Sequence, residues 1–342
     1  MQMKTIVYMV NTEYHLYVTI GIICKYYSEN YNNIIYRVSP IGGKRLNNIN
    51  LRGVKNTTYK EILYNYSKPD KKLKEKLDEL IAIRPDKFFF YLENKFWLNY
   101  LLKKLHKSGT KIILGPDGMK AYNDKYNSIW KIKKSIIRNL FLSLKCRLWG
   151  VWPLIERYYA TSKYIDEVWV ENLPLYKNRT NKVARAFSMP QDMIFFTLLN
   201  KVFCAKEDDF LPLKGQTILF IDSPIIKKEY IEKTIDILSA FQSAHPDRRL
   251  LIKMHQLSSA TAKQTYSDKL NVEYLDSNYP AELYIANAEN AIIISLVSTS
   301  LLFYNPNCKY YWTYQLYGDM FDYSKLKNPT HHIKTISQLS GI

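Results

Sequence analysis

The chain has 342 residues, which suggests about two domains. Its 47% hydrophobic content excludes a wholly disordered chain, and its four cysteines lack the spacing of a zinc ribbon or a disulfide scaffold. Lys and Arg outnumber Asp and Glu by 49 to 31, so the net charge of +18 predicts an anionic partner: nucleic acid, a phospholipid surface, a nucleotide-linked donor or an acidic acceptor.

Apolar and amphipathic segments alternate along the first part of the chain. The run at 5–10 is continuously apolar, which is typical of a strand buried on both faces. Leu73, Leu77 and Leu80 form one stripe of a helix that Pro85 ends. The pattern predicts strands at 5–10, 33–38, 88–92 and 111–114, and helices at 12–27, 70–83 and 94–107. This alternation indicates a parallel sheet with helices on both faces.

Positive charge concentrates at 125–155, which holds seven Lys and Arg residues and no Asp or Glu. Its apolar residues recur at helical spacing, so it is either a helix on an anionic membrane surface or a core-packed helix with a solvated basic side. No apolar run approaches the roughly 20 residues that span a bilayer, and no signal peptide is visible. We therefore expect a cytoplasmic protein, with peripheral attachment to the inner face of the cytoplasmic membrane as the alternative.

The second half repeats the alternation. It predicts strands at 217–222, 249–253, 272–275, 291–295 and 308–314, with helices at 228–244 and 280–288. The segment 156–215 is irregular and proline-containing, so we expect domains at 1–155 and 216–342 joined by a connection. The predicted fold class is α/β, of the GT-B type: two Rossmann-like domains with parallel sheets facing a central cleft.

Ligands of such sheets bind beyond the carboxyl ends of the strands, so the residues that follow each strand are the candidates. Asp117 lies in a Gly-Pro-Asp-Gly turn after 111–114, where it is either a general base or a turn cap. His255 follows 249–253 and is either a proton donor or phosphate ligand, or a surface histidine.

Three hydroxyls, those of Ser298, Thr299 and Ser300, follow the strand at 291–295. At the start of a helix they either bind an anion together with free N–H groups or cap the helix. Glu282, in the first turn of 280–288, either accepts hydrogen bonds from a ribose diol or complements the helix dipole.

This combination resembles the bacterial sialyltransferases of glycosyltransferase families 52 and 80. Their motif order is D/E-D/E-G, H-P, a glutamate and a Ser/Thr pair; Glu282 lies 27 positions after His255, and Thr299 lies 17 after Glu282, as in that layout. The sequence departs from the motifs at Pro116 and Gln256.

The start of the chain is similar to family 52 and to the polysialyltransferases, in which a strand leads into a T-P-x-H-L-like segment. Here that segment is Asn11-Thr12-Glu13-Tyr14-His15-Leu16, with Glu13 in place of the proline. On this resemblance, Asn11, Thr12, His15 and Gly118 are candidate acceptor or cleft residues.

The resemblance implies an inverting, metal-independent transfer of sialic acid or a related nonulosonic acid from a CMP-linked donor to a hydroxyl of a bacterial surface glycan, either lipooligosaccharide or capsule. Asp117 is then the catalytic base in an acceptor-binding domain at 1–155. His255, Glu282, Ser298, Thr299 and Ser300 bind the CMP donor in the domain at 216–342, with His255 also catalytic. No cofactor or metal is expected.

The expected partners are the donor and an oligosaccharide or glycolipid acceptor, and family 52 also includes dimers. One alternative is a GT-B transferase that uses a UDP- or GDP-sugar. The other is a basic nucleic-acid-binding protein, but no RNP, KH, zinc-finger or clear helix-turn-helix signature is present, so we expect no nucleic-acid partner.

Overall fold

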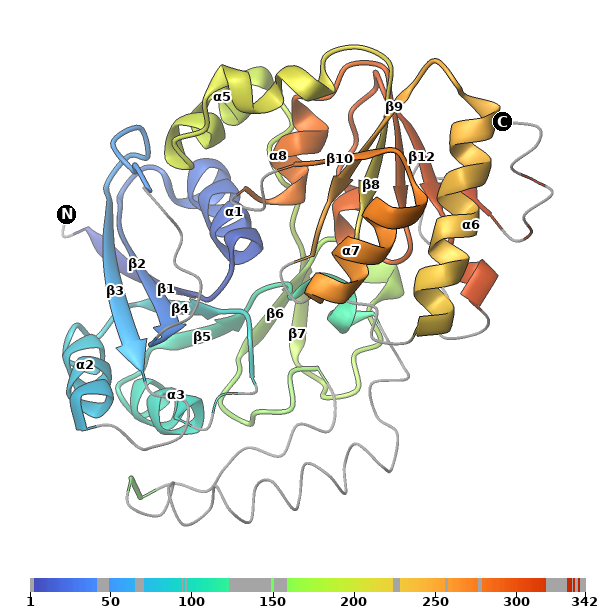
Figure 1. Ribbon diagram of the computed structural model, residues 1–342. Coiled ribbons are helices and arrows are strands. Elements are labelled where there is room, and N and C mark those ends of the chain that lie inside the picture. The colour runs from blue at the N-terminus through green and yellow to red at the C-terminus, as the bar shows by residue number, and fades with distance from the viewer. Residues whose placement is uncertain are drawn as a thin grey trace. The chain divides into compact units, whose positions relative to one another are not determined.

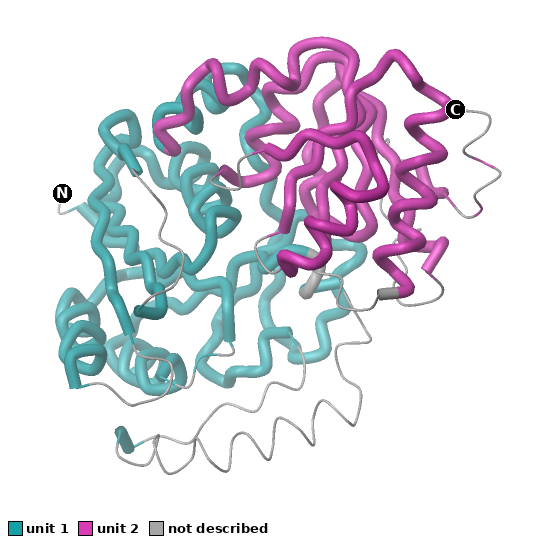
Figure 2. The backbone as a smooth tube through the Cα atoms, in the orientation of Figure 1, with its two compact units in different colours: residues 1–202 teal, residues 203–342 magenta. Residues whose placement is uncertain are grey.

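The computed structural model describes residues 3–41, 49–64, 71–93, 95, 97–122, 149–150, 159–223, 228–255, 258–275, 279–317, 331–333, 335 and 338. The chain divides into two compact units, residues 1–202 and 203–342 (Figure 2). The basic stretch predicted at 125–155 lies outside the described residues except for 149–150. Among the described helices, none has the length and apolar character that crossing a bilayer requires.

The first unit contains a parallel sheet of order β3-β2-β1-β4-β5-β6-β7 (Figure 1). Its strands are β1 (Lys4–Val10), β2 (Tyr31–Pro40), β3 (Thr57–Tyr64), β4 (Lys87–Phe90), β5 (Lys111–Leu114), β6 (Glu167–Val170) and β7 (Val183–Ala186). The helices are α1 (Glu13–Ile22), which continues as a π-helical segment (Ile23–Tyr27), α2 (Lys71–Ala82), α3 (Leu98–Lys107) and α5 (Met193–Val202). Short 3-10 turns lie at Gly118–Ala121 and Leu173–Leu175.

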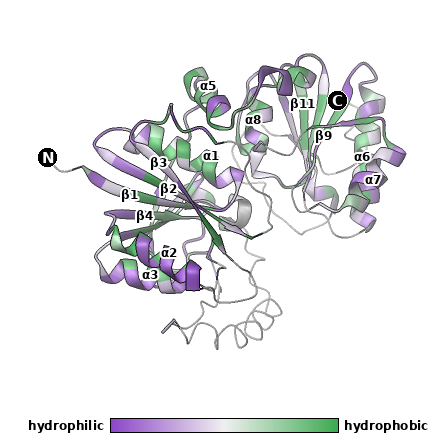
Figure 3. Ribbon diagram, turned by 60° about the vertical axis from the view of Figure 1, so that its left-hand side comes forward, coloured by the Kyte–Doolittle hydropathy of each residue, from purple (hydrophilic) through white to green (hydrophobic). Residues whose placement is uncertain are grey.

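The sheet is apolar on both faces because helices cover both (Figure 1). Val7 and Met9 of β1 belong to the core that includes the fully buried leucine stripe of α2 and the apolar side of α3. Figure 3 shows that these two helices also carry hydrophilic residues. On the other face, Tyr8 stacks on Phe89 with ring centroids 5.1 Å apart, on the side that α1 covers.

The second unit contains a parallel sheet of order β10-β9-β8-β11-β12-β13. Its strands are β8 (Thr217–Ile221), β9 (Arg249–Lys253), β10 (Val272–Tyr274), β11 (Ala291–Ser295), β12 (Lys309–Trp312) and β13 (His331–His332). The helices are α6 (Lys228–Ala244), α7 (Ala260–Lys269) and α8 (Ala281–Ala286), with 3-10 turns at Glu207–Leu213, Thr299–Leu302 and Tyr314–Tyr317. The central strands β8 and β11 are buried along their whole length.

The segment 156–215, predicted as an irregular connection, differs in the structure. Strands β6 and β7 extend the first sheet, α5 contacts α1, and the units divide between 202 and 203 rather than at 155 and 216. Both strands have four residues, and β7 is mostly exposed, so neither has the long apolar pattern that marks a buried strand. Pairing with the existing sheet determines their structure.

Candidate active site

In the first unit, a histidine and an aspartate meet at the carboxyl ends of the central strands. His15 lies in the first turn of α1, which follows β1, and Asp117 follows β5. The distance between His15 Nε2 and Asp117 Oδ1 is 3.2 Å. The His15 side chain is 1% exposed and the Asp117 side chain 21%, so the aspartate is the member of the pair that solvent or a ligand can reach.

Two residues before α1 fix the orientation of His15. Thr12 is the N-cap of α1, and its hydroxyl accepts the backbone N–H of His15 at 3.2 Å. The backbone N–H of Asn11 donates to His15 Nδ1 at 3.4 Å, while the Asn11 side chain donates to the Val38 carbonyl at 3.0 Å. Because Nδ1 accepts, the neutral ring carries its proton on Nε2 and donates it to Asp117.

Tyr91, which the sequence analysis missed, supports this pair. It follows β4, the strand between β1 and β5, and stacks on the His15 ring with centroids 4.7 Å apart and an interplanar angle of 11°. Its hydroxyl lies 2.6 Å from Thr19 Oγ1. Burial raises the pKa of Tyr91 well above its usual value, so the phenol stays neutral.

The Gly115–Gly118 turn needs both of its glycines. A Cβ on Gly115 would lie 2.4 Å from Cε1 of Tyr91, so only glycine allows the ring to reach His15. Gly118 has a φ of +57°, the left-handed region that favours glycine. Tyr159 donates a hydrogen bond to the Gly115 carbonyl, and burial together with the charge of Asp117 raises the pKa of that phenol.

In the second unit, His255 joins a carboxylate that the sequence analysis also missed. Asp222 follows β8, the strand beside β9, and its Oδ2 accepts the backbone N–H of His255 at 3.3 Å and the hydroxyl of Ser258. Burial raises the pKa of Asp222. His255 is exposed, whereas Asp222 is buried, so Asp222 holds the His255 backbone and Ser258 from the interior of the unit.

A chain of hydroxyls connects β11 to α8. Ser295 Oγ donates to the Ile221 carbonyl at 2.8 Å and accepts the Ser298 N–H at 3.2 Å. Ser298 Oγ in turn donates to Ser300 Oγ at 3.1 Å, and Ser300 Oγ donates to Glu282 Oε1 at 2.9 Å. Thr299 begins the 3-10 turn and is half-buried. The hydroxyls and Glu282 therefore form one network.

Lys253, the last residue of β9, carries a positive charge that acts on both His255 and Glu282. It is 7% exposed, and its Nζ lies 5.7 Å from the centroid of the Tyr284 ring. Desolvation and the charge of Lys253 lower the pKa of His255. Burial raises the pKa of Glu282, against the opposing effects of its own backbone N–H, of Ser300 and of Lys253. The sequence could have indicated both Lys253 and Asp222, because each is a charged residue at the carboxyl end of a buried strand.

The predicted residues thus gather in two clusters. One holds Asn11, Thr12, His15, Asp117 and Gly118 in the first unit; the other holds Glu282, Ser298, Thr299 and Ser300 in the second, where His255 follows a separate strand and shares with Glu282 the influence of Lys253. A common role for the two clusters stays a prediction. Within the residues that the structure describes, no group of three His, Cys, Asp or Glu side chains is placed to hold a metal ion.

Comparisons with known proteins agree with this architecture. The family model "Alpha-2,8-polysialyltransferase (POLYST)" matches residues 6–309. No curated protein matches the chain by sequence.

Among solved structures, the GT-B domain of the Photobacterium damselae sialyltransferase superposes with a TM-score of 0.51 at 12% identity, covering 90% of this chain and 91% of that one. Staphylococcus aureus MnaA with UDP gives 0.55 at 10% identity, covering 91% and 79%. The Neisseria meningitidis UDP-GlcNAc 2-epimerase bound to UDP-GlcNAc gives 0.51 at 11% identity, covering 87% and 79%. These likenesses confirm the predicted GT-B fold class.

Proposed function

Because the chain belongs to the alpha-2,8-polysialyltransferase family, we propose that it transfers sialic acid or a related nonulosonic acid from a CMP-linked donor to a hydroxyl of a bacterial surface glycan, with inversion. Family membership makes it a glycosyltransferase of the sialyltransferase type, with a nucleotide-sugar donor and a glycan acceptor. The observation that carries the proposal is the His15–Asp117 pair, a partly exposed carboxylate held by a buried histidine where parallel strands end.

In the proposed reaction, the acceptor oxygen forms a bond to the anomeric carbon while the bond from that carbon to the CMP phosphate oxygen breaks. Asp117 takes the proton of the acceptor hydroxyl. His15 acts as a positioning residue, because its Nε2–H holds the carboxylate and its own orientation is set by Asn11, Thr12 and Tyr91.

We assign the donor to the second unit. His255 and the hydroxyls of Ser298, Thr299 and Ser300 stabilise the departing CMP phosphate, with His255 as a proton donor. Lys253 adds a fixed positive charge beside them. Glu282 accepts from the ribose hydroxyls, and Asp222 positions the loop that carries His255. His255 and the hydroxyls can donate hydrogen bonds and Lys253 carries a positive charge, so these groups can stabilise developing negative charge, which supports a transfer that needs no metal or cofactor.

The test is the change Asp117→Ala, assayed by release of CMP from CMP-sialic acid in the presence of a glycan acceptor. Loss of a general base typically costs about 10²- to 10⁴-fold, so kcat should fall by that factor while CMP binding, measured by calorimetry, is unchanged. The matched control is Asp86→Ala, at the amino end of β4, where the carboxylate accepts only the Thr5 N–H at 2.8 Å among the contacts of the described residues.

Two further experiments test the metal requirement and the identity of the donor nucleotide. Turnover in the presence of EDTA should equal that with Mg²⁺ added, and a strict Mg²⁺ requirement would contradict the metal-independent mechanism. CMP should raise the melting temperature, whereas UDP and GDP should not; the reverse would favour a UDP- or GDP-sugar transferase. Full activity of Asp117→Ala would remove Asp117 as the base. Attachment to the cytoplasmic membrane through 125–155 and a homodimer remain proposals.

A further inference from the structure

Three basic residues begin strands of the first sheet, at the ends opposite the His15–Asp117 pair, and a fourth, further along β7, joins them through a shared carboxylate, Glu167. Lys4, Lys87, Lys111 and Arg185 come from β1, β4, β5 and β7, respectively. The strand registers place them on one face: Lys4 lies two residues before Ile6, the partner of Lys87, and Lys87 pairs with Lys111. This is the face that α1 covers. We call these four residues the basic edge.

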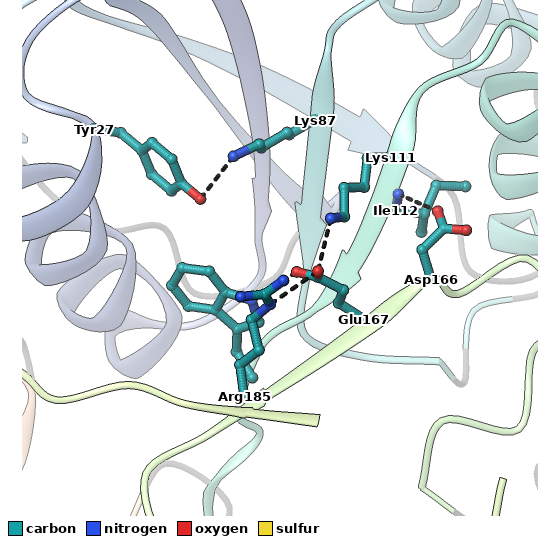
Figure 4. Close-up of polar contacts among 8 residues, drawn as sticks. Tyr27, Lys87, Lys111, Ile112, Asp166, Glu167 and Arg185 are labelled. Atoms are coloured by element: carbon teal, nitrogen blue, oxygen red, sulfur yellow. Dashed lines mark hydrogen bonds and ion pairs between the residues drawn. The ribbon is translucent and has the colours of Figure 1, made fainter. Parts of the chain in front are cut away.

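One buried carboxylate lies among them, and three donors already satisfy it. Glu167 Oε1 lies 2.6 Å from Lys111 Nζ and 2.9 Å from Arg185 Nε, and Glu167 Oε2 accepts from Trp169 Nε1 at 3.3 Å (Figure 4). Burial alone would raise the pKa of Glu167, but these hydrogen bonds outweigh it and lower the pKa. Glu167 is therefore ionised and fully engaged.

Two other carboxylates nearby face other partners. Asp86 directly precedes Lys87, and Asp166 directly precedes Glu167. Because successive side chains alternate between the faces of a sheet, we expect both aspartates to face away from the basic edge. Asp86 accepts the backbone N–H of Thr5 at 2.8 Å, and Asp166 accepts that of Ile112 at 2.7 Å. In Figure 4 Asp166 points away from Lys87. On its own face of the sheet, and among the described residues, the basic edge thus holds four positive charges beside one paired carboxylate, Glu167.

Lys87 is partly buried against the Tyr27 ring. Its Nζ donates to the Tyr27 hydroxyl at 3.0 Å and lies 4.5 Å from the centroid of the Tyr27 ring and 5.7 Å from that of the neighbouring Tyr31 ring. Burial, followed by the charge of Lys111, lowers the pKa of Lys87; Glu167 opposes this, while Lys4 and Arg185 act in the same direction as Lys111. Lys111 and Arg185 are 42% and 56% exposed, so an anion from solvent can reach the group.

We propose that the basic edge is a binding site for a phosphate group of the phosphomonoester class, separate from the candidate active site. A phosphomonoester carries about −1.5 to −2 charges at pH 7 and three oxygens that accept charge-assisted hydrogen bonds, so it can contact ammonium groups from several strands at once. A carboxylate, with one charge and two oxygens, balances the group less completely. The proposal does not depend on the proposed function, because no residue of the basic edge takes part in the proposed transfer.

The test uses the full chain and the change Lys87→Gln. This change leaves Lys111 and Arg185 on Glu167 and so keeps the buried carboxylate paired. The matched control is Lys263→Gln, since Lys263 also lies over a tyrosine ring, 4.6 Å from the centroid of Tyr274, but in the second unit. Lys87→Arg keeps the charge. Melting temperatures in chloride at constant ionic strength show whether each variant is folded.

One arm titrates inorganic phosphate, with acetate as the carboxylate control, and follows binding by calorimetry and melting temperature. We expect phosphate to bind the wild type and Lys263→Gln equally, and Lys87→Gln at least about tenfold more weakly, because one charge-assisted hydrogen bond is lost. The second arm measures sedimentation with vesicles of phosphatidylcholine that contain phosphatidic acid, which displays the same phosphate group on a lipid.

A loss confined to Lys87→Gln and restored in Lys87→Arg supports the site. If the loss occurs with inorganic phosphate, the ligand is free phosphate; if it occurs only with vesicles, the ligand is a lipid headgroup. Equal binding by the wild type, Lys87→Gln and Lys263→Gln in both arms overturns the proposal. Measured activity with CMP-sialic acid is a separate readout, so failure of the basic edge and failure of the proposed transfer can be told apart.

Discussion

At the scale of single residues, neighbouring hydrogen bonds and charges define how each side chain can act. The backbone N–H of Asn11 selects the tautomer of His15, and that tautomer places a donor on Asp117. Lys253 has a comparable effect in the second unit, where its charge lowers the pKa of His255 and opposes the rise that burial produces in the pKa of Glu282. Neither Asn11 nor Lys253 needs to react in order to matter.

Glu282 gives a prediction on pH dependence. Its pKa is raised above the ordinary value of 4.5, so folding favours the neutral carboxyl: the stabilisation is complete below pH 4.5 and is lost as pH rises through the raised pKa. Gln at this position is neutral throughout. From pH 4.5 towards 7, the free energy of unfolding of Glu282→Gln should therefore rise relative to that of the wild type.

Urea denaturation at several pH values measures this difference. A difference that does not change with pH would contradict the raised pKa. Under the proposed function, the same variant should also bind CMP more weakly. The control is Glu289→Gln, an exposed carboxyl three residues after α8.

At the scale of elements, the candidate active site depends on three adjacent strands that end at one level. β4 lies between β1 and β5, and the residue that follows it, Tyr91, lies between the turn at Gly115 and the ring of His15. Thr19 of α1 bonds the Tyr91 hydroxyl, which ties the helix to the strand. The elements therefore hold His15 through packing as well as through hydrogen bonds.

The change Gly115→Ala tests this packing. The new Cβ would lie 2.4 Å from a ring carbon of Tyr91, so either the ring or the turn must shift. We expect the free energy of unfolding to fall by about 1–3 kcal/mol and the transfer rate to fall with it, because His15 loses its stacking partner.

The control for this prediction is Gly53→Ala. Its Cβ would lie 2.7 Å from Cδ1 of Leu198, the end of a flexible side chain that can move aside. Chemical denaturation of both variants makes the comparison. Equal stability of Gly115→Ala and the wild type would show that the Tyr91 ring is not held against the turn.

At the scale of the whole molecule, two units carry two kinds of chemistry. The first holds a carboxylate–histidine pair at one edge of its sheet and the basic edge at the other; the second holds the hydroxyls, His255 and Lys253. Each unit has its own parallel sheet and its own buried strands. A ligand that binds only the hydroxyls, His255 and Lys253 should therefore protect backbone amides of the second unit from exchange.

Amide hydrogen exchange, measured with and without CMP, shows which unit binds the nucleotide. We expect amide exchange to slow at 254–259 after β9 and at 296–302 after β11, with β2 and β3 of the first unit unchanged, because phosphate contacts restrict the loops that make them. UDP is the control nucleotide and should protect neither loop. Protection confined to the first unit would contradict the assignment of the donor.

The sequence by itself determined the class of fold and named candidate site residues. Continuous apolar runs such as 5–10 and 291–295 must be buried on both faces, so they predict the central strands of parallel sheets, and polar residues after them predict where a ligand binds. Asp117, His255 and Ser298 were predicted as site residues in this way, and Glu282 from its place in the first turn of a helix. Short, partly exposed strands such as β7 carry no such pattern, because an edge strand can be polar on both faces.

Tertiary structure decided which side chains meet. The bond from His15 to Asp117 spans 102 positions, and the stack of Tyr91 on His15 depends on strand order, which no local pattern contains. The same is true of the basic edge: its four cations are scattered over more than 180 positions, and parallel strand registers bring them to one face. The net charge indicated an anionic partner and the sequence located one basic stretch at 125–155, but only the pairing of strands shows that these four cations lie on one face.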